Sequence, residues 1–476
     1  MYLKFMIVYI YYIYVTFAQS VNLKPGSETR QLWEKMPFPL SFKVYVFNVT
    51  NSANIEAGGK PQLQEVGPFV YDEWKDKYDI VDIEAENAVS FNMRNTFQFR
   101  PDLGLSGEEL ITMPHPLLQF LAIANLAQPA EVQAAVALGL DLIFQPQSAF
   151  ITAKFKDLFY AGIDVNCGSD HAAVQAICQQ FQAGAVPGAV ALNATHYKFS
   201  LMGGASPLLG NHTNAGRFKV LRTSGSKQLT VGQILAYNEA EQLQVWQETN
   251  GSSCNRLRGT DGTIFAPLMQ PQHGLWSYSA QLCRSLTPKA MGKTKYNQLP
   301  AQRYELSFGS PSVSERVILG LQAELFEREK RIYRKDFPVK SQSNLSLQTE
   351  PDLHCFCTDF PGDCPADGTM DLRRCSGTPL MASLPHFYQA DPRLVEQVEG
   401  LSPTAAKHAS TMIFEQLSGT VLTVYNRLQF SLKVMPVKDV PTMAQLRPLA
   451  MPLFWIEESL QLDEKITQLL HKKIFA

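Results

Sequence analysis

The periodicity of apolar residues changes twice along the chain, and this change limits the folds open to it. Residues 40–112 follow a period of two, as in VSFNMR at 89–94 and around Phe42, Val44 and Val46. Such alternation predicts strands with one face in the core. Residues 113–183 change to helical spacing, and the period of two returns from residue 195. Strands on both sides of a helical block predict one large α+β domain.

Four apolar stripes within 113–183 have the spacing of a helix face. Pro116 suits a first helical turn, and Pro129 and Pro146 separate the stripes. We therefore expect a small helical bundle inserted into a β protein. The stripes are Leu117/Phe120/Leu121/Ala124, Val132/Val136/Leu140/Ile143, Ile151/Phe155/Leu158/Phe159 and Val174/Ile177/Cys178/Phe181.

Two further local patterns predict strand features. Alternation is cleanest in LQFSLKV at 428–434, where Gln429, Ser431 and Lys433 separate the apolar residues. This pattern predicts a strand with a polar outer face. The pair Gly67-Pro68 predicts a turn or the edge of a strand, because proline cannot donate to a ladder.

Cysteines and glycosylation sequons together indicate the compartment. The eight cysteines are even in number, six lie between 254 and 375, and the chain also has five N-x-[ST] sequons. This combination favours an oxidising, glycosylating compartment over a cytosolic protein with eight buried thiols. The sequons are at Asn48, Asn193, Asn211, Asn250 and Asn344.

Charge and motifs exclude several classes of protein. Lys+Arg (42) and Asp+Glu (44) nearly cancel to a net charge of −2, which argues against a nucleic-acid binder. The sequence contains no G-x-S-x-G, H-E-x-x-H, P-loop or G-x-G-x-x-G motif. His115 and His386 are more often core or capping residues than ligands. The HCFC run at 354–357 favours disulfides over zinc, because Cys-x-Cys is not the usual knuckle spacing. We expect no enzyme activity, no metal and no cofactor.

The two ends of the chain differ from the rest. Residues 1–20 contain an apolar run of 14 residues, Phe5 to Ala18, which reads as a signal-like core or a partial N-terminal membrane anchor. Residues 471–476 (HKKIFA) resemble the juxtamembrane flank of a span that the sequence does not contain.

An ordered set of motifs carries a family resemblance. FKVYVFNVTN (42–51), EVGPFVYDEW (65–74), GTDGTIF (259–265), SLPHFYQADP (383–392) and PLFWIEE (452–458) resemble the class B scavenger receptor family. That family includes the fatty-acid translocase and the lysosomal integral membrane proteins. LKPGSETRQLWEKMPF (23–38), ITMPHPLLQ (111–119) and DLHCFC (352–357) are most similar to the insect sensory neuron membrane proteins.

The resemblance implies a fold and a domain plan. It implies a large antiparallel β-barrel ectodomain over residues 21–470, with an apical helical bundle at 113–183 and an internal hydrophobic tunnel. Residues 254–375 would form a disulfide-linked region. Residues 313–348 have no counterpart in the family, and are either an insertion or a gene-model artefact.

The resemblance also implies three disulfides, and the two remaining cysteines suggest a fourth. The implied pairs are Cys254–Cys355, Cys283–Cys375 and Cys357–Cys364. Cys167 and Cys178 are left over and flank a short loop before the fourth helical stripe, so we predict that they form a bridge.

The function that the resemblance implies is a membrane receptor for lipids. Such a receptor or co-receptor would pass fatty-acid-derived ligands such as pheromones through the tunnel, toward the plasma membrane or an odorant receptor complex in chemosensory neurons. The alternative is a general scavenger receptor for lipids, lipoproteins or apoptotic cells. A turn at 144–147 with little charge, followed by Lys154 and Lys156, favours a neutral ligand such as an aldehyde, acetate or ester. The sequence assigns no ligand-binding residues.

Overall fold

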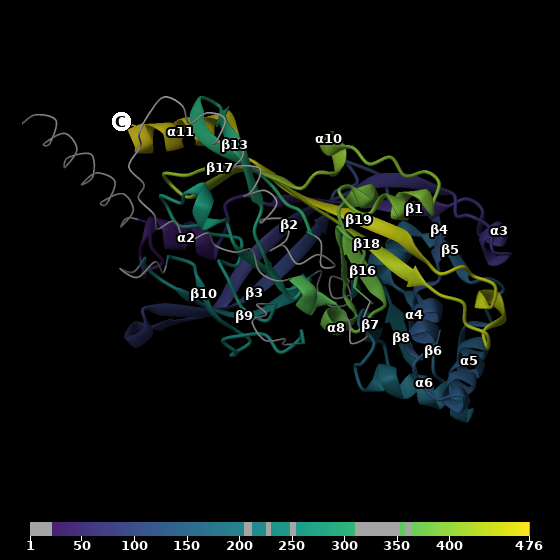
Figure 1. Cartoon of the computed structure of the whole chain (residues 1–476). Coiled ribbons are helices and arrows are strands. Elements are labelled where there is room, and N and C mark those ends of the chain that lie inside the picture. Colours follow the sequence, from purple (N-terminus) through teal and green to yellow (C-terminus); the bar gives the residue numbers. More distant parts are fainter. Residues whose placement is uncertain are drawn as a thin grey trace, which may run out of the picture.

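A twelve-stranded antiparallel sheet forms the centre of the computed structural model, which describes residues 21–203, 212–224, 230–247, 254–309, 353–357 and 364–475. The fold is mixed α/β, with several helices beside this sheet (Figure 1). In spatial order its main strands are β10 (Ile234–Tyr237), β9 (His212–Leu221), β3 (Ala88–Phe99), β2 (Leu63–Ile83), β1 (Leu40–Val49), β19 (Leu449–Gln461), β18 (Thr420–Val434), β17 (Thr411–Glu415), β14 (Leu299–Glu305) and β13 (Lys289–Tyr296).

Shorter strands extend this sheet or form small ones. β16 (Leu380–Ser383) pairs with β18 and with β15 (Thr369–Asp371), and within the described residues the main path is open at β10 and β13. Three small sheets accompany it: β4 (Leu110–Pro114) with β5 (Phe150–Lys154), β6 (Ile163–Asn166) with β8 (His196–Phe199) and β7 (Ala189–Ala191), and β11 (Ser277–Ser279) with β12 (Arg284–Leu286).

The first and last long strands of the chain lie side by side. β1 and β19 are antiparallel, with Ser41 opposite Ser459, so the start of β1 is adjacent to the end of β19. α2 (Glu28–Glu34) precedes β1 and α11 (Glu464–Phe475) follows β19, and both helices lie at the left of Figure 1. The described chain therefore enters and leaves the sheet at the same end of the molecule.

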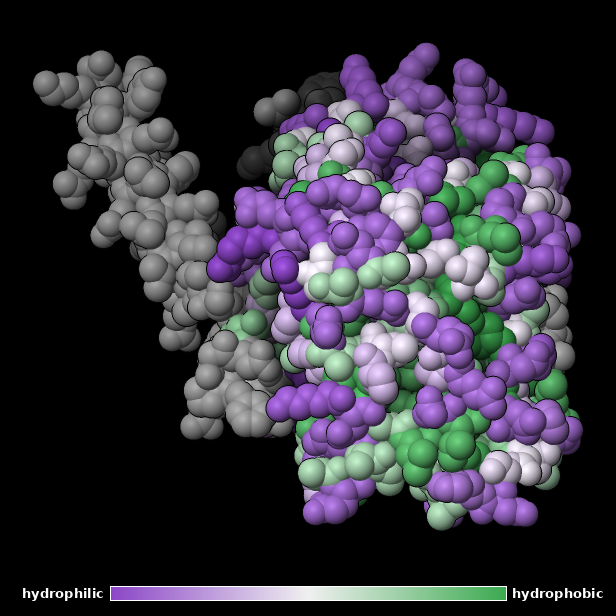
Figure 2. Space-filling model, turned by 90° about the vertical axis from the view of Figure 1, so that its right-hand side faces the viewer, coloured by the Kyte–Doolittle hydropathy of each residue, from purple (hydrophilic) through white to green (hydrophobic). Residues whose placement is uncertain are grey.

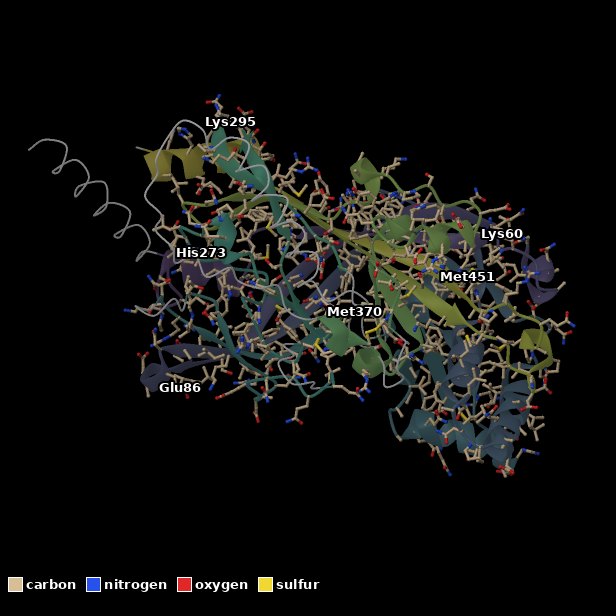
Figure 3. The ribbon with its side chains drawn as sticks, in the orientation of Figure 1. Lys60, Glu86, His273, Lys295, Met370 and Met451 are labelled. Carbon is tan, nitrogen blue, oxygen red and sulfur yellow. A yellow bond between two sulfur atoms is a disulfide. The ribbon has the colours of Figure 1, made fainter. Side chains whose placement is uncertain are left out.

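Strand β2 runs along most of the molecule. It has 21 residues, which at about 3.3 Å per residue could extend roughly 70 Å. Lys60 lies just before β2 and Glu86 just after it, and Figure 3 places these two residues at opposite sides of the molecule. β2 thus connects the end that carries α2 and α11 with the opposite end.

Three helices gather at that opposite end, at the lower right of Figure 1. They are α4 (Pro116–Ala124), α5 (Ala130–Phe144) and α6 (Ala172–Gln182), and α5 packs against both of the others. His115 and His171 cap α4 and α6, because each Nδ1 accepts a hydrogen bond from a first-turn backbone N–H. Gly139 lets α5 approach α6, since a Cβ there would collide with the carbonyl of Ala173.

The third apolar stripe is helical only in its second part. Ile151 lies in β5, paired with Met113 of β4, while Phe155, Leu158 and Phe159 lie in a short helical segment at 155–161 that is mostly a π-helical turn. These three residues are buried in an aromatic cluster. Phe155 stacks on Phe159 and on Phe69 of β2, and this aromatic cluster joins the helical end to the sheet.

Two strand expectations also need correction. Gly67 and Pro68 lie inside β2 rather than at a turn, opposite an irregularity in the register with β1, where a ladder tolerates proline. Gln429 and Ser431 do not face solvent and are fully buried. The Gln429 Oε1 accepts a hydrogen bond from the backbone N–H of His386 at 2.7 Å, because residues 384–389 cover this face of β18.

The remaining short helices lie in the connections. α3 (Ser52–Glu56) follows β1, while α8 (Arg373–Ser376), α9 (Pro392–Glu396) and α10 (Ala405–His408) lie between β15 and β17. The structure contains the disulfides Cys254–Cys355, Cys283–Cys375, Cys357–Cys364 and Cys167–Cys178. The last one ties the end of β6 to α6 in the helical cluster.

We predict that replacing both Cys167 and Cys178 with Ala lowers the free energy of unfolding by about 3 kcal/mol, because a loop of this length loses its cross-link in the unfolded state. Thermal unfolding of the wild type and the double variant measures the change. Peptide mapping of the wild type without reduction should yield one linked peptide that contains both residues. Two free thiols at these positions would contradict the prediction.

Candidate ligand-binding cavity

A cavity of about 930 Å³ lies at the end of the molecule where α2 and α11 meet the sheet. This volume is near the upper end of the range of about 300–1,000 Å³ that is typical of ligand pockets. Strands β1, β2, β3, β9, β18 and β19 contribute to its wall, together with both helices. The cavity is therefore built from segments that are far apart in the sequence.

The two helices are fixed in place by polar contacts. Arg30 of α2 donates to Asp82 of β2 at 2.7 Å, and Lys77 donates to the carbonyl of Trp33 at 2.9 Å. On the other side, Tyr296 donates to the carbonyl of Leu462 at 2.7 Å, just before α11. These contacts hold Leu32 of α2 and Leu470 of α11 in the cavity wall.

Most of the wall is apolar. The alternation in β3, β18 and β19 directs every second side chain inward, and the helices add their own apolar faces. A wall of this kind stabilises hydrocarbon chains by about 0.8 kcal/mol for each buried CH₂ group. Representative lining residues are Met36, Phe38, Phe218, Leu282, Val424 and Leu460.

Several polar side chains interrupt the apolar wall, and we call four of them, Asn95, Lys75, Glu458 and Asn426, the polar belt. They lie on neighbouring strands: Lys75 is opposite Asn95 between β2 and β3, and Asn426 is opposite Glu458 between β18 and β19. Lys75 and Glu458 form an ion pair across the cavity wall. All four residues line the cavity.

Electrostatics favour the charged form of Lys75. Burial alone would lower the pKa of Lys75, but the contact with Glu458, together with the charge of Glu73 when that group is ionised, outweighs burial and raises it. Burial, followed by the charge of Glu458, raises the pKa of Glu73 and so favours its neutral acid form. Burial lowers the pKa of Lys77 to about 8. Glu73, Lys75 and Lys77 occupy alternate positions on β2, so all three point inward.

A second polar group lies apart from the cavity, and its two histidines are buried while Glu65 is exposed. His386 Nε2 and Trp455 Nε1 both contact the Oε2 of Glu65, each at 2.7 Å. The ring of His408 stacks on the ring of His386 with centroids 4.2 Å apart. One potential ligand atom of each of Glu65, His386 and His408 lies within 4.8 Å of the others.

The hydrogen bonds of this group favour a structural role over a metal site. Nδ1 of His386 accepts from the backbone N–H of Ser402 at 3.1 Å, and Nδ1 of His408 accepts from that of Thr404 at 2.9 Å. An N–H can only donate, so each neutral ring must carry its proton on Nε2. A ring that binds metal through Nε2 needs the opposite tautomer, with Nδ1–H donating to an acceptor.

Burial and hydrogen bonding within this group shift the pKa values of Glu65 and His408. Burial alone would raise the pKa of Glu65, but the hydrogen bonds from His386 and Trp455 outweigh it and hold the pKa below its ordinary value. Burial, aided by the neighbouring His386, lowers the pKa of His408 to about 4. His386 also holds a backbone φ of 54°, which is uncommon outside glycine, so these buried bonds fix a strained segment on the sheet.

The sequence motifs at 23–38 and 259–265 supply part of the cavity wall, whereas the histidines and sequons singled out in the sequence do not line it. His115 is buried as the cap of α4, where burial lowers its pKa to about 4. Asn48 is half-buried in β1 and Asn193 is exposed in the turn before β8, where its Oδ1 accepts from Thr195. Glycosylation at either site stays a prediction. Asn211, Asn250, Asn344 and the segments 1–20 and 313–348 lie outside the described residues.

Sequence reasoning assigned no residue to the cavity. Glu73, Lys75 and Lys77 carried a usable signal, because they share the inward face of β2 with the buried Tyr71. The ion pair with Glu458 carried none, since the partners are separated by most of the chain. Among the residues that the structure describes, no helix has both the length and the apolar character needed to cross a bilayer.

The fold and cavity together define a disulfide-bonded protein of the ligand-binding class, in which an antiparallel sheet and two terminal helices enclose a largely apolar space. Comparison with known proteins specifies the class further. The model of the CD36 family matches residues 1–476, and the chain belongs to this family. CD36 proteins are class B scavenger receptors, membrane proteins with a large ectodomain that act as receptors or lipid binders rather than enzymes.

Within the family, the chain is similar to insect sensory neuron membrane proteins. It is 39% identical over 466 residues to sensory neuron membrane protein 1 of Anopheles gambiae, and 36% identical over 462 residues to that of Aedes aegypti. Each alignment covers 96% of this chain and 76% of the relative. The corresponding protein of Manduca sexta is 32% identical over 461 residues.

We predict that acidification destabilises the protein partly through His408. A histidine with an ordinary pKa near 6.5 in the unfolded chain and about 4 in the folded protein contributes stability that is complete above pH 6.5. This contribution, of order 3 kcal/mol, is lost as the pH falls from about 6.5 through 4. Chemical denaturation of wild type and H408N at several pH values measures it.

The substitution H273N is the matched control, because His273 Nδ1 also accepts from a nearby backbone N–H but is exposed (labelled in Figure 3). Glu65, His386, Lys407 and Arg427 are the charged or titratable groups around His408. H408N should lose stability less steeply than H273N between pH 6.5 and 4. Equal slopes for the two variants would show that His408 does not contribute.

Proposed function

We propose that this chain is a membrane-anchored receptor or co-receptor that passes hydrophobic, fatty-acid-derived ligands such as pheromones through an internal tunnel. The ligands would reach the plasma membrane or an odorant receptor complex in chemosensory neurons. The cavity of about 930 Å³ between α2 and α11 is the observation that carries this proposal. The similarity to sensory neuron membrane proteins supports the sensory setting.

The position of the cavity suits delivery to a membrane. It is enclosed by the helices nearest both ends of the described chain, so anchors at the chain ends would place it next to the bilayer. The helices α4, α5 and α6 would then form the apical bundle of a single ectodomain over residues 21–470. In this proposal, the sheet closes into a barrel and the tunnel follows β2 from that bundle to the cavity.

The charges near the helical end favour an uncharged ligand. Lys154 lies 2.7 Å from a carboxylate oxygen of Glu108, and Lys156 contacts the other oxygen of the same group. One carboxylate therefore offsets much of the positive charge of both lysines. A long apolar chain with a neutral head would meet little electrostatic selection at this end, and chain length would dominate its affinity.

A specific surface feature supports a second candidate function. Val132, Leu138 and Leu142 are exposed on α5, at 41%, 46% and 41% of their surface. Figure 2 faces the end of the molecule that carries α5 and shows hydrophobic side chains among hydrophilic ones there. An exposed apolar helix face is typical of a surface that contacts particles or other proteins. A general scavenger receptor for lipids, lipoproteins or apoptotic cells would use such a surface.

We predict that V424W, which fills the cavity from β18, abolishes the response to a lipid ligand. The full-length chain and an odorant receptor are expressed together in cells, and the response is recorded as calcium influx. Val424 lines the cavity and is only half-buried, so the larger ring extends into the ligand space. The expected result is a loss of at least tenfold in sensitivity.

The substitution V81W introduces the same side chain on the exposed part of β2 and is the control, since half of the surface of Val81 is accessible to solvent (50%). Both variants must reach the cell surface at wild-type levels. Binding of lipoprotein particles is recorded in parallel. If V424W responds normally, transport through the cavity is excluded.

A third variant, L138D, tests the exposed surface of α5. If L138D abolishes particle binding, and the odorant response does not depend on the cavity, the scavenger function is favoured.

A further inference from the structure

We propose that the polar belt is a headgroup site and that it selects a hydroxyl group, so that the cavity prefers long-chain alcohols to the matching aldehydes, esters and carboxylates. This inference rests on the proposed lipid-carrying function and adds the class of headgroup. It concerns the ligand space between α2, α11 and the sheet, where Asn95 and Lys75 face each other across neighbouring strands.

Asn95 supplies the first reason. Its side chain is almost completely buried, with 4% of its surface exposed, and it lines the cavity. Its Oδ1 has almost no accessible surface and no hydrogen-bond donor among the described residues, so a ligand reaches this atom once the side chain turns toward the cavity. A buried acceptor without a partner costs about 1–3 kcal/mol, so a ligand that brings a donor to this atom gains affinity. Hydroxyl groups can donate, whereas aldehydes and esters cannot.

Lys75 supplies the second reason. Its ammonium group has three N–H donors, and its ion pair is with Glu458. The side chains of Lys75 and Glu458 keep 18% and 21% exposure although both line the cavity, so part of each is accessible from the ligand space. Residues opposite each other in antiparallel strands have Cβ atoms about 5 Å apart. One hydroxyl can therefore accept from Lys75 and donate to Asn95.

The charge balance argues against a carboxylate. Lys75 already pairs with Glu458, and Asp261, a buried residue with 8% of its surface exposed, lies in the same wall. A ligand carboxylate would add a negative charge beside these two acidic groups without bringing a cation, and it has no proton to donate to Asn95. Burying an uncompensated charge costs far more than burying a hydroxyl that is hydrogen-bonded at both of its polar functions.

The test compares four ligands with the same sixteen-carbon chain: the alcohol, the aldehyde, the acetate ester of the alcohol and the carboxylate. Each displaces a fluorescent lipid probe from the full-length chain in detergent micelles at pH 7.4, where the acid is ionised. Matched hydrocarbon length keeps the apolar contribution constant. We expect the alcohol to bind roughly tenfold more tightly than the aldehyde or ester, which corresponds to one additional buried hydrogen bond. The carboxylate should bind most weakly.

The substitution N95L removes the unpaired acceptor while keeping a side chain of similar size. It should reduce the alcohol affinity about tenfold, to that of the aldehyde, and should leave the aldehyde affinity unchanged. It should also raise the thermal midpoint of the ligand-free protein, because an unsatisfied buried acceptor is lost. The matched control is N92L on the same strand, since Asn92 contacts Asp79 on the outer face. N92L should change neither affinity.

The outcomes separate this inference from the function on which it rests. If no ligand displaces the probe, and V424W does not weaken probe binding, the lipid-carrying function fails. If all four ligands bind with equal affinity and V424W blocks them, the function stands and the headgroup site is overturned. An alcohol preference that survives in N95L also overturns the assignment to Asn95.

Discussion

The pairing of β1 with β19 is the constraint on which the rest of the structure depends. It joins the first long strand of the described chain to the last, with Ser41 opposite Ser459, and so forces α2 and α11 to the same end. Neither helix alone could enclose a ligand, because each is short and covers one side of the sheet. Their shared location creates the cavity, whose wall also takes residues from both β1 and β19.

The helices at the two ends of the molecule are attached to the sheet by different sets of contacts. The helical end is held to the sheet by aromatic packing, in which Phe155 stacks on Phe69 and Phe159 meets Phe454 edge to face. At the cavity end, polar contacts such as Arg30–Asp82 act together with apolar contacts, such as that of Trp33 with Phe91, in holding the terminal helices. The long strand β2 belongs to both regions.

Local patterns predicted much of the fold, while the site depended on contacts between distant residues. Alternation correctly predicted β1, β3 and β18, and helical spacing predicted α4, α5 and α6, because each signal is contained within one element. The third stripe was wrong at Ile151, which pairs with Met113 in a strand, and right only for the short helical segment that follows. Gln429 seemed suited to solvent, yet it is buried by a segment about forty residues earlier. The pair Lys75–Glu458 has no local signature, and only the family resemblance indicated a lipid-binding interior.

The polar contacts of α2 and α11 have a consequence for how the protein is handled. Leu32 and Leu470 belong to the two opposite extremes of the described chain, yet both form part of the cavity wall. Segments that resemble dispensable tails in the sequence are therefore part of the binding chamber. Cleavage by a protease before β1 or after β19 would remove a side of that chamber and leave the sheet intact. Such a trimmed protein could remain folded while its apolar interior is open to water. A measurement of its secondary structure would not reveal that part of the cavity wall is lost.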